Sequence, residues 1–109
     1  MDDIIKLAQE LADRFTNSET YSEYARAKEK IEGDPDLLKK IGEFYSASEA
    51  YEARRLNGEE IHFDEERILS NQYTEIWLDE NGRAYMAAKN KLTVTLGKIF
   101  EIIGTECDI

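Results

Sequence analysis

The sequence has little of the residues from which disulfide frameworks and compact catalytic sites are built. Its 109 residues include one cysteine, one histidine, one tryptophan and one proline. A single cysteine, Cys107, cannot form a disulfide within the chain and suits a reducing compartment. No apolar run approaches the ~20 residues that cross a bilayer, and the acidic, amphipathic start is unlike a signal peptide. We therefore expect a cytoplasmic protein.

Basic residues are outnumbered by acidic ones. Charged residues make up 35% of the chain, and 24 acidic against 14 basic side chains give a net charge of −10. Such a surface repels phosphate backbones and anionic lipid headgroups. We therefore expect no direct binding to nucleic acid and none to a membrane, and we look for partners among proteins.

Residues 34–58 predict one long helix with a marked start and a marked end. Asp34 offers a carboxylate to the first free N–H groups, and Pro35 takes the first helical position, where no N–H is needed. Arg54-Arg55 falls in the last turn, where the helix dipole favours positive charge, and Asn57-Gly58 supplies a left-handed stop. The helix has an apolar stripe, which includes Leu37, Leu38, Ile41, Phe44, Tyr45 and Tyr51.

Apolar residues at three- and four-residue spacing predict four more helices, and strand signals are weak. The fold class is therefore all-α: five amphipathic helices in an antiparallel bundle, completed by oligomerisation. We expect a single domain over residues 1–109, with residues 105–109 as a flexible tail. The four further helices are expected at about residues 2–15, 19–32, 64–81 and 83–103.

Local signals predict where several of these helices begin and end. Residues 16–19 have the form of a capping box and start the second helix, and Gly33 ends it. Asp64 is predicted as the N-cap of the fourth helix, with Phe63 and Ile68 as a hydrophobic staple. Asn81-Gly82 is predicted to end or kink that helix.

The last helix differs from the rest of the chain in charge and in apolar content. Residues 81–100 contain no acidic residue and carry four basic ones, and apolar residues occur on more than one side. A helix that is apolar nearly all round requires burial, either in the core of a monomer or between subunits. We favour a homo-oligomer, with a dimer as the first choice, while the monomer core stays open as the alternative. The interface residues would be Tyr85, Leu92, Leu96, Ile99 and Ile103.

No constellation of residues indicates catalysis, and we identify no catalytic, cofactor-binding or metal-binding residue. His62 lies among Glu59, Asp64 and Glu65, but this segment lacks the ligand spacing of a metal site and is interpreted as a solvated loop. Nucleophile elbows and phosphate-binding glycine loops are absent. The tyrosines and Trp77 have helical spacing, which favours core packing over base stacking. An alternative function is an iron–sulfur or metal-binding oligomer that shares Cys107 across subunits, although clusters normally need four thiolates.

The order and spacing of motifs along nearly the whole chain resemble the YlbF/YmcA family of small helical proteins from Gram-positive bacteria. The matching features are Ala8-x-Glu-Leu-Ala12, Ser18-Glu-x-Tyr21-x-x-Tyr24-x-x-Ala27-Lys28, Asp34-Pro35-Asp36, then Leu38, Phe44, Tyr51, Arg55 and Gly58, then Asp64-Glu65-Glu66 and Tyr85-x-x-Ala88-x-x-x-Leu92.

The resemblance implies a non-enzymatic regulatory or adaptor protein that acts through protein–protein contacts. Members of the family support competence, sporulation and biofilm formation, in association with ribonuclease Y-dependent RNA maturation. The expected partner is therefore a paralogue or a ribonuclease-associated protein. Some members use several C-terminal cysteines to hold iron–sulfur clusters, whereas this chain has only Cys107 there.

Overall fold

The chain folds into five α-helices and, within the residues described, contains no strand, which confirms the all-α fold class. The structure is a computed structural model that describes residues 2–107. The predicted flexible tail falls partly outside this range, because residues 108 and 109 are not described, and the last helix continues through Glu106. The helices are α1 (Asp2–Thr16), α2 (Glu19–Glu32), α3 (Pro35–Leu56), α4 (Phe63–Leu78) and α5 (Glu80–Glu106).

Three of the predicted helix ends are confirmed in detail. The Ser18 hydroxyl accepts a hydrogen bond from the backbone N–H of Tyr21 at 3.2 Å and starts α2. The Asp34 carboxylate accepts from the N–H of Leu37, also at 3.2 Å, and Pro35 is the first residue of α3. Gly58 has a φ of +78°, the left-handed conformation that a stop after this helix requires.

The predicted start of α4 is wrong. The helix begins at Phe63, so His62 takes the cap position without a side-chain hydrogen bond, and Asp64 lies inside the first turn. There its carboxylate faces the positive end of the helix dipole instead of capping it. Phe63 and Ile68 are both mainly exposed, so the predicted staple buries neither side chain.

The prediction that Asn81-Gly82 ends or kinks the fourth helix is also wrong. Helix α4 ends earlier, at Leu78, and Asp79 separates it from α5. The Asp79 carboxylate accepts from the N–H groups of Asn81 and Gly82 at 2.9 and 3.0 Å, so it caps a new helix in which both residues form the first turn. Gly82 serves close packing here: a Cβ on it would lie 2.4 Å from the carbonyl oxygen of Ile76.

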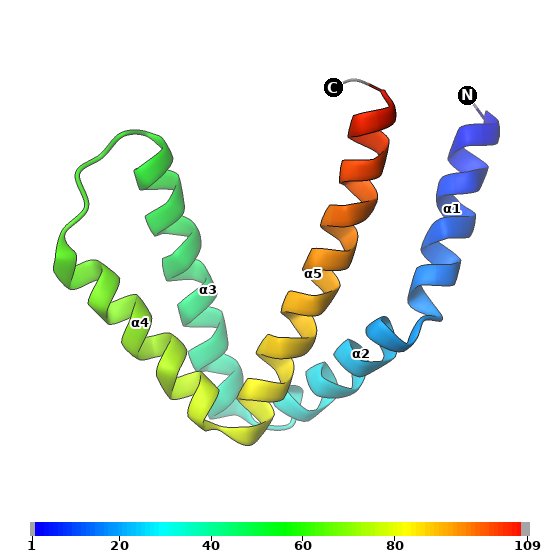
Figure 1. Cartoon of the computed structure of the whole chain (residues 1–109). Coiled ribbons are helices and arrows are strands. Elements are labelled where there is room, and N and C mark those ends of the chain that lie inside the picture. The colour runs from blue at the N-terminus through cyan, green and yellow to red at the C-terminus, as the bar shows by residue number, and fades with distance from the viewer. Residues whose placement is uncertain (1, 108–109) are drawn as a thin grey trace.

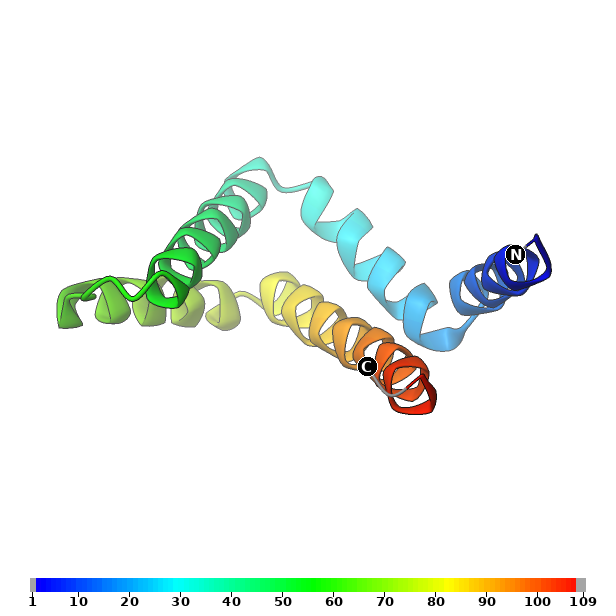
Figure 2. The same cartoon turned by 90° about the horizontal axis from the view of Figure 1, so that it is seen from above.

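The core lies at one vertex of the molecule, where four helix ends meet. Figures 1 and 2 show α3 and α4 as one arm, α2 and α5 leaving the vertex on its other side, and α1 continuing from the end of α2 that is far from the vertex. Helix α1 contributes no buried residue. The buried side chains come from the end of α2, the start of α3, the end of α4 and the start of α5: Ala27, Ile31, Leu37, Ile41, Ile76, Tyr85, Met86 and Ala88.

The described structure is open. Its radius of gyration is 17.3 Å and its extents are 49 × 38 × 17 Å, whereas a compact domain of this length has a radius of gyration of about 13 Å. The helices therefore radiate from a small core and do not enclose a large one.

Replacing Gly82 by alanine tests the vertex. We expect Gly82→Ala to lower the free energy of unfolding by about 1–3 kcal/mol, because its methyl group meets the backbone of Ile76 and α4 and α5 must shift apart. Gly42→Ala is the matched control, since a Cβ there meets nothing within 4 Å and the change in an exposed helix interior should add about 0.5–1 kcal/mol. Urea unfolding at one fixed protein concentration measures both. Equal effects of the two substitutions would contradict the packing argument.

Candidate interaction surface

Helix α5 has a buried first half and an exposed second half. Tyr85 is only 7% exposed and packs against Tyr24 of α2, with ring centroids 5.8 Å apart. Tyr85 therefore has its packing partner within its own chain, and the structure does not bring it to the surface expected for assembly. The other four predicted interface residues lie farther along α5: Leu92 and Ile99 are half-buried, while Leu96 and Ile103 are exposed.

The second half of α5, residues 92–106, is here called distal α5. Phe100 is 69% exposed, and Val94 and Ile102 are also mainly exposed. At 100° per residue Val94 lies nearly opposite the stripe of Leu92, Leu96, Ile99 and Ile103, while Phe100 and Ile102 flank the stripe on its two sides. Distal α5 thus presents apolar side chains around most of its circumference, as its sequence indicated, and the chain itself covers only part of them.

A second uncovered surface lies on α1. The sequence predicts an amphipathic helix here, but all of its large aliphatic residues are exposed, and Leu11, the least exposed of them, remains 44% accessible. We call this surface the α1 face; it is formed by Ile4, Ile5, Leu7, Ala8 and Leu11. The helical period in the sequence showed that α1 has an apolar face, but it carries no information on whether that face is covered by the same chain.

The α1 helix has only weak support of its own. Its ion pair, Arg14 to Glu10 at 2.8 Å, is solvent-exposed and contributes about 0.3–0.5 kcal/mol. Isolated helices of 15 residues are marginal in water, and most helical stability in proteins comes from packing of the apolar face. A stable α1 therefore requires an apolar partner surface.

The accessible area gives the size of the uncovered surface. The chain exposes 8535 Å², whereas a folded monomer of 12.6 kDa exposes about 6,200 Å². The excess is roughly 2,300 Å² per chain. Part of this excess is the apolar surface of α1 and distal α5 that the chain itself leaves uncovered.

Helix α1 and distal α5 are both slightly acidic. Helix α1 carries four acidic and two basic residues, and distal α5 carries Glu101, Glu106 and Lys98, while the other three basic residues of the acid-free run 81–100 lie in the first half of α5. Within the described chain, Lys91 pairs with Glu23 at 3.4 Å, and the ammonium of Lys89 lies 3.6 Å from the centroid of the Tyr45 ring. Among the described ion pairs none involves Lys98 or Asp13, so both charges are available to other chains.

Tyrosines near the vertex pack in the core, as their spacing predicted. Burial raises the pKa of Tyr85 far above its usual range, with a further contribution from the neighbouring Tyr24. Burial also raises the pKa of Tyr45, whose hydroxyl donates to the sulfur of Met86 at 3.2 Å. Both phenols are therefore held neutral by their surroundings.

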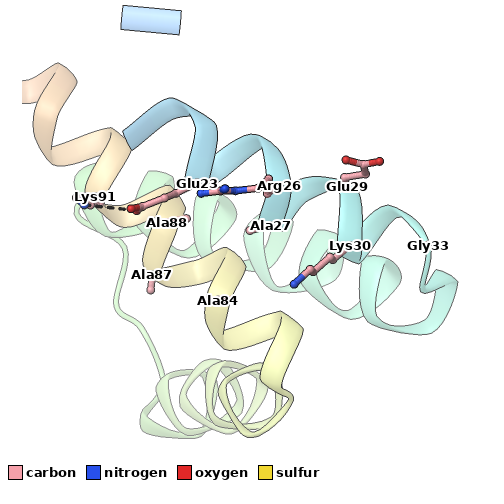
Figure 3. Close-up of a pocket in the computed structure, with 10 residues that line it drawn as sticks. All are labelled: Glu23, Arg26, Ala27, Glu29, Lys30, Gly33, Ala84, Ala87, Ala88 and Lys91. Carbon is pink, nitrogen blue, oxygen red and sulfur yellow. Dashed lines mark hydrogen bonds and ion pairs between the residues drawn. The ribbon is translucent and has the colours of Figure 1, made fainter. Parts of the chain in front are cut away.

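A groove of about 780 Å³ runs between α2 and α5 (Figure 3). Its floor is made of small side chains and its rim of charges of both signs, so it offers methyl groups where a substrate pocket would offer converging polar groups. The floor residues are Ala27, Gly33, Ala84, Ala87 and Ala88, and the rim residues are Glu23, Arg26, Glu29, Lys30 and Lys91.

The structure does not bring together the residues that could react or bind a metal ion. His62 is exposed in the loop before α4, and Cys107 is exposed at the end of α5. Over residues 2–107 no three histidine, cysteine, aspartate or glutamate side chains come together in a way that could hold a metal ion. None of the described helices combines the length and the apolar content needed to cross a bilayer.

The tip of the α3–α4 arm carries a third apolar surface, which the sequence reading did not single out. Leu56 and Phe63 flank the connecting loop, and each is 74% exposed. Arg54 holds the loop in place, with its guanidinium 2.8 Å from Glu65 and 3.4 Å from Glu59. The tip therefore presents two large apolar side chains among fixed acidic ones.

The fold and these surfaces define a small all-α protein whose prominent features are uncovered helix faces. The chain belongs to the family described as control of competence regulator ComK, YlbF/YmcA, whose model it matches over residues 4–107. The motif resemblance noted in the sequence is thereby confirmed.

The similarity to individual relatives extends over nearly the whole length of both chains. A UPF0342 protein of Symbiobacterium thermophilum is 28% identical over 94% of this chain and 91% of its own length. A UPF0342 protein of Caldicellulosiruptor bescii is 31% identical over 94% of this chain and 87% of its own length. A solved structure, a protein of unknown function (DUF964) from Bacillus stearothermophilus, has a TM-score of 0.83 and 17% identity over 97% of this chain and 93% of that one, and it shows the shared fold.

The buried tyrosines predict a loss of stability at high pH. Because the pKa of Tyr85 is raised in the folded state, the unfolded chain, with a phenol pKa of about 10, releases its proton first as the pH rises. The stabilisation is present below pH ~10 and is lost above it. Urea unfolding between pH 8 and pH 11 should show a steeper fall for the wild-type protein than for Tyr85→Phe; equal slopes would contradict the assignment.

Proposed function

We propose that the protein is a non-enzymatic regulatory adaptor that works as a homo-oligomer, most simply a dimer, through protein–protein contacts. The observation that carries this proposal is the excess accessible area of roughly 2,300 Å² per chain. Covering it in a dimer would remove about 4,600 Å² in total, within the range of obligate homodimers. Membership of a family described by control of a competence regulator supports a regulatory role.

The assembly surface of this proposal is distal α5, where Leu92, Leu96, Ile99 and Ile103 form a stripe that its own chain leaves partly open. The surface for a further partner is the tip of the α3–α4 arm, which points away from α1 and distal α5 (Figure 1). A paralogue or a ribonuclease-associated protein with an apolar pocket and a basic rim would fit Leu56, Phe63 and the acidic loop between them. The net charge of −10 favours such a protein over RNA.

Light scattering tests the assembly. We expect a mass of about twice 12.6 kDa at micromolar concentration for the wild-type protein. Leu96→Asp should raise the dissociation constant at least ~100-fold, because the new carboxylate is desolvated in both copies. Asn90→Asp, which adds the same charge on the opposite side of α5, is the control and should leave the mass unchanged. Helicity must be equal in all three proteins, and a wild-type monomer would overturn the proposal.

Affinity capture from native cytoplasm tests the tip. We expect a protein that the wild-type chain retains and the double variant Leu56→Ser, Phe63→Ser loses, while the double variant stays oligomeric. Because both side chains are exposed, the substitutions should leave folding intact. Asn71→Ser on α4 is the control for an exposed substitution away from the tip. Capture of the same proteins by all three chains would show that the tip is not the partner surface.

A further inference from the structure

We infer that the α1 face of one chain packs against distal α5 of a second copy, and reciprocally, so that the two chains complete one four-helix bundle. This inference rests on the proposed homo-oligomer and specifies how it is built. Its starting point is that both helices expose apolar side chains and project on the same side of the molecule. Figures 1 and 2 show α1 and distal α5 projecting beyond the start of α2, on the side away from the α3–α4 arm.

Helix α1 is held in this projecting position at its base. The Ser18 hydroxyl donates to the carbonyl of Phe15 at 2.6 Å, and the side-chain amide of Asn17 donates to the carbonyl of Asp13 at 2.8 Å. The rings of Phe15 and Tyr21 also lie edge to face across the turn, 6.4 Å apart. These contacts fix the turn between α1 and α2, so the α1 face has to be covered by something outside the chain.

The two helices match in length, and their pairing opposes less like charge than pairing of two α1 helices. Helix α1 and distal α5 each contain 15 residues, which is about 22 Å of helix. Pairing α1 with another α1 would bring eight acidic and four basic residues together, whereas pairing α1 with distal α5 brings six acidic and three basic residues together. Exchange of α1 between chains therefore opposes fewer like charges than pairing of α1 with α1.

Two copies also explain why distal α5 is apolar on more than one side. One neighbouring helix covers a stripe of roughly 100°, which leaves Val94, Phe100 and Ile102 exposed if the stripe of Leu96 is covered. In a two-fold bundle each distal α5 gains two neighbours, the partner's α1 and the partner's α5. A single peptide docking on this surface would cover only one side.

Cross-linking tests the exchange directly. In a Cys107→Ser background, one chain carries Ala8→Cys and a size-tagged chain carries Ile99→Cys, and the two are co-expressed. These positions lie near the centres of α1 and distal α5, so they meet whether the helices run parallel or antiparallel. A short bismaleimide should join the two different chains. Lys6→Cys, on the opposite side of α1, replaces Ala8→Cys as the control and should give little product.

A second measurement separates this inference from the proposed homo-oligomer. Leu11→Asp changes a side chain that is exposed in the single chain, so it should leave helicity intact and raise the dissociation constant at least ~10-fold, in the same direction as the larger change expected for Leu96→Asp. Gln9→Asp adds the same charge outside the α1 face and should have no effect. If Leu96→Asp dissociates the protein but Leu11→Asp does not, the exchange is wrong and the homo-oligomer stands. The same conclusion follows if cross-links join position 8 to position 8, or position 99 to position 99, and never position 8 to position 99. Monomers throughout would overturn both.

Discussion

The contact between Ile76 and Gly82 is the constraint on which the rest of the structure depends. Ile76 is 1% exposed at the end of α4, and its carbonyl oxygen approaches Gly82 more closely than any side chain would permit. Asp79 makes this approach feasible, because its carboxylate satisfies the first N–H groups of α5 while the chain turns. With α4 and α5 joined so tightly, Ile31 of α2 and Ile41 of α3 close the vertex around them.

Because the core is confined to one vertex, it supports only the parts of the helices that meet there. Eight buried residues at the meeting point of four helices hold the helix ends together, but a helix of 22 or 27 residues extends well beyond them. On the α3–α4 arm, the two helices cover each other, and ion pairs such as Arg54 to Glu65 fasten the far end. On the other side, α2 has 14 residues against 27 in α5, and its start lies beside the middle of α5, so within the described chain α1 and distal α5 extend beyond the helices that could cover them. The open shape thus follows from unequal helix lengths around a small core.

Much of the fold could be predicted from the sequence, because helix ends are decided by local chemistry. Ser18, Asp34 and Gly58 act within a few residues of themselves, and each was placed correctly. Asn81-Gly82 was misread because its role is tertiary: the glycine there allows α4 to approach, which no local pattern records. The same limit applies to the site. The apolar stripes of α1 and α5 were visible, but only the packing shows that Tyr85 faces α2 while Leu96 and Leu11 face solvent.

The distribution of charge is consistent with separate roles for the two ends of the molecule. Residues 81–100 of α5 contain no acidic residue, whereas α1 carries four acidic and two basic residues. The tip of the α3–α4 arm has the opposite arrangement, with acidic residues fixed beside exposed Leu56 and Phe63. A surface of that kind cannot pair with its own copy without opposing like charges. In the proposed assembly the second copy covers one end of the molecule, and the other end stays accessible to a different, basic partner, which is the arrangement that an adaptor requires.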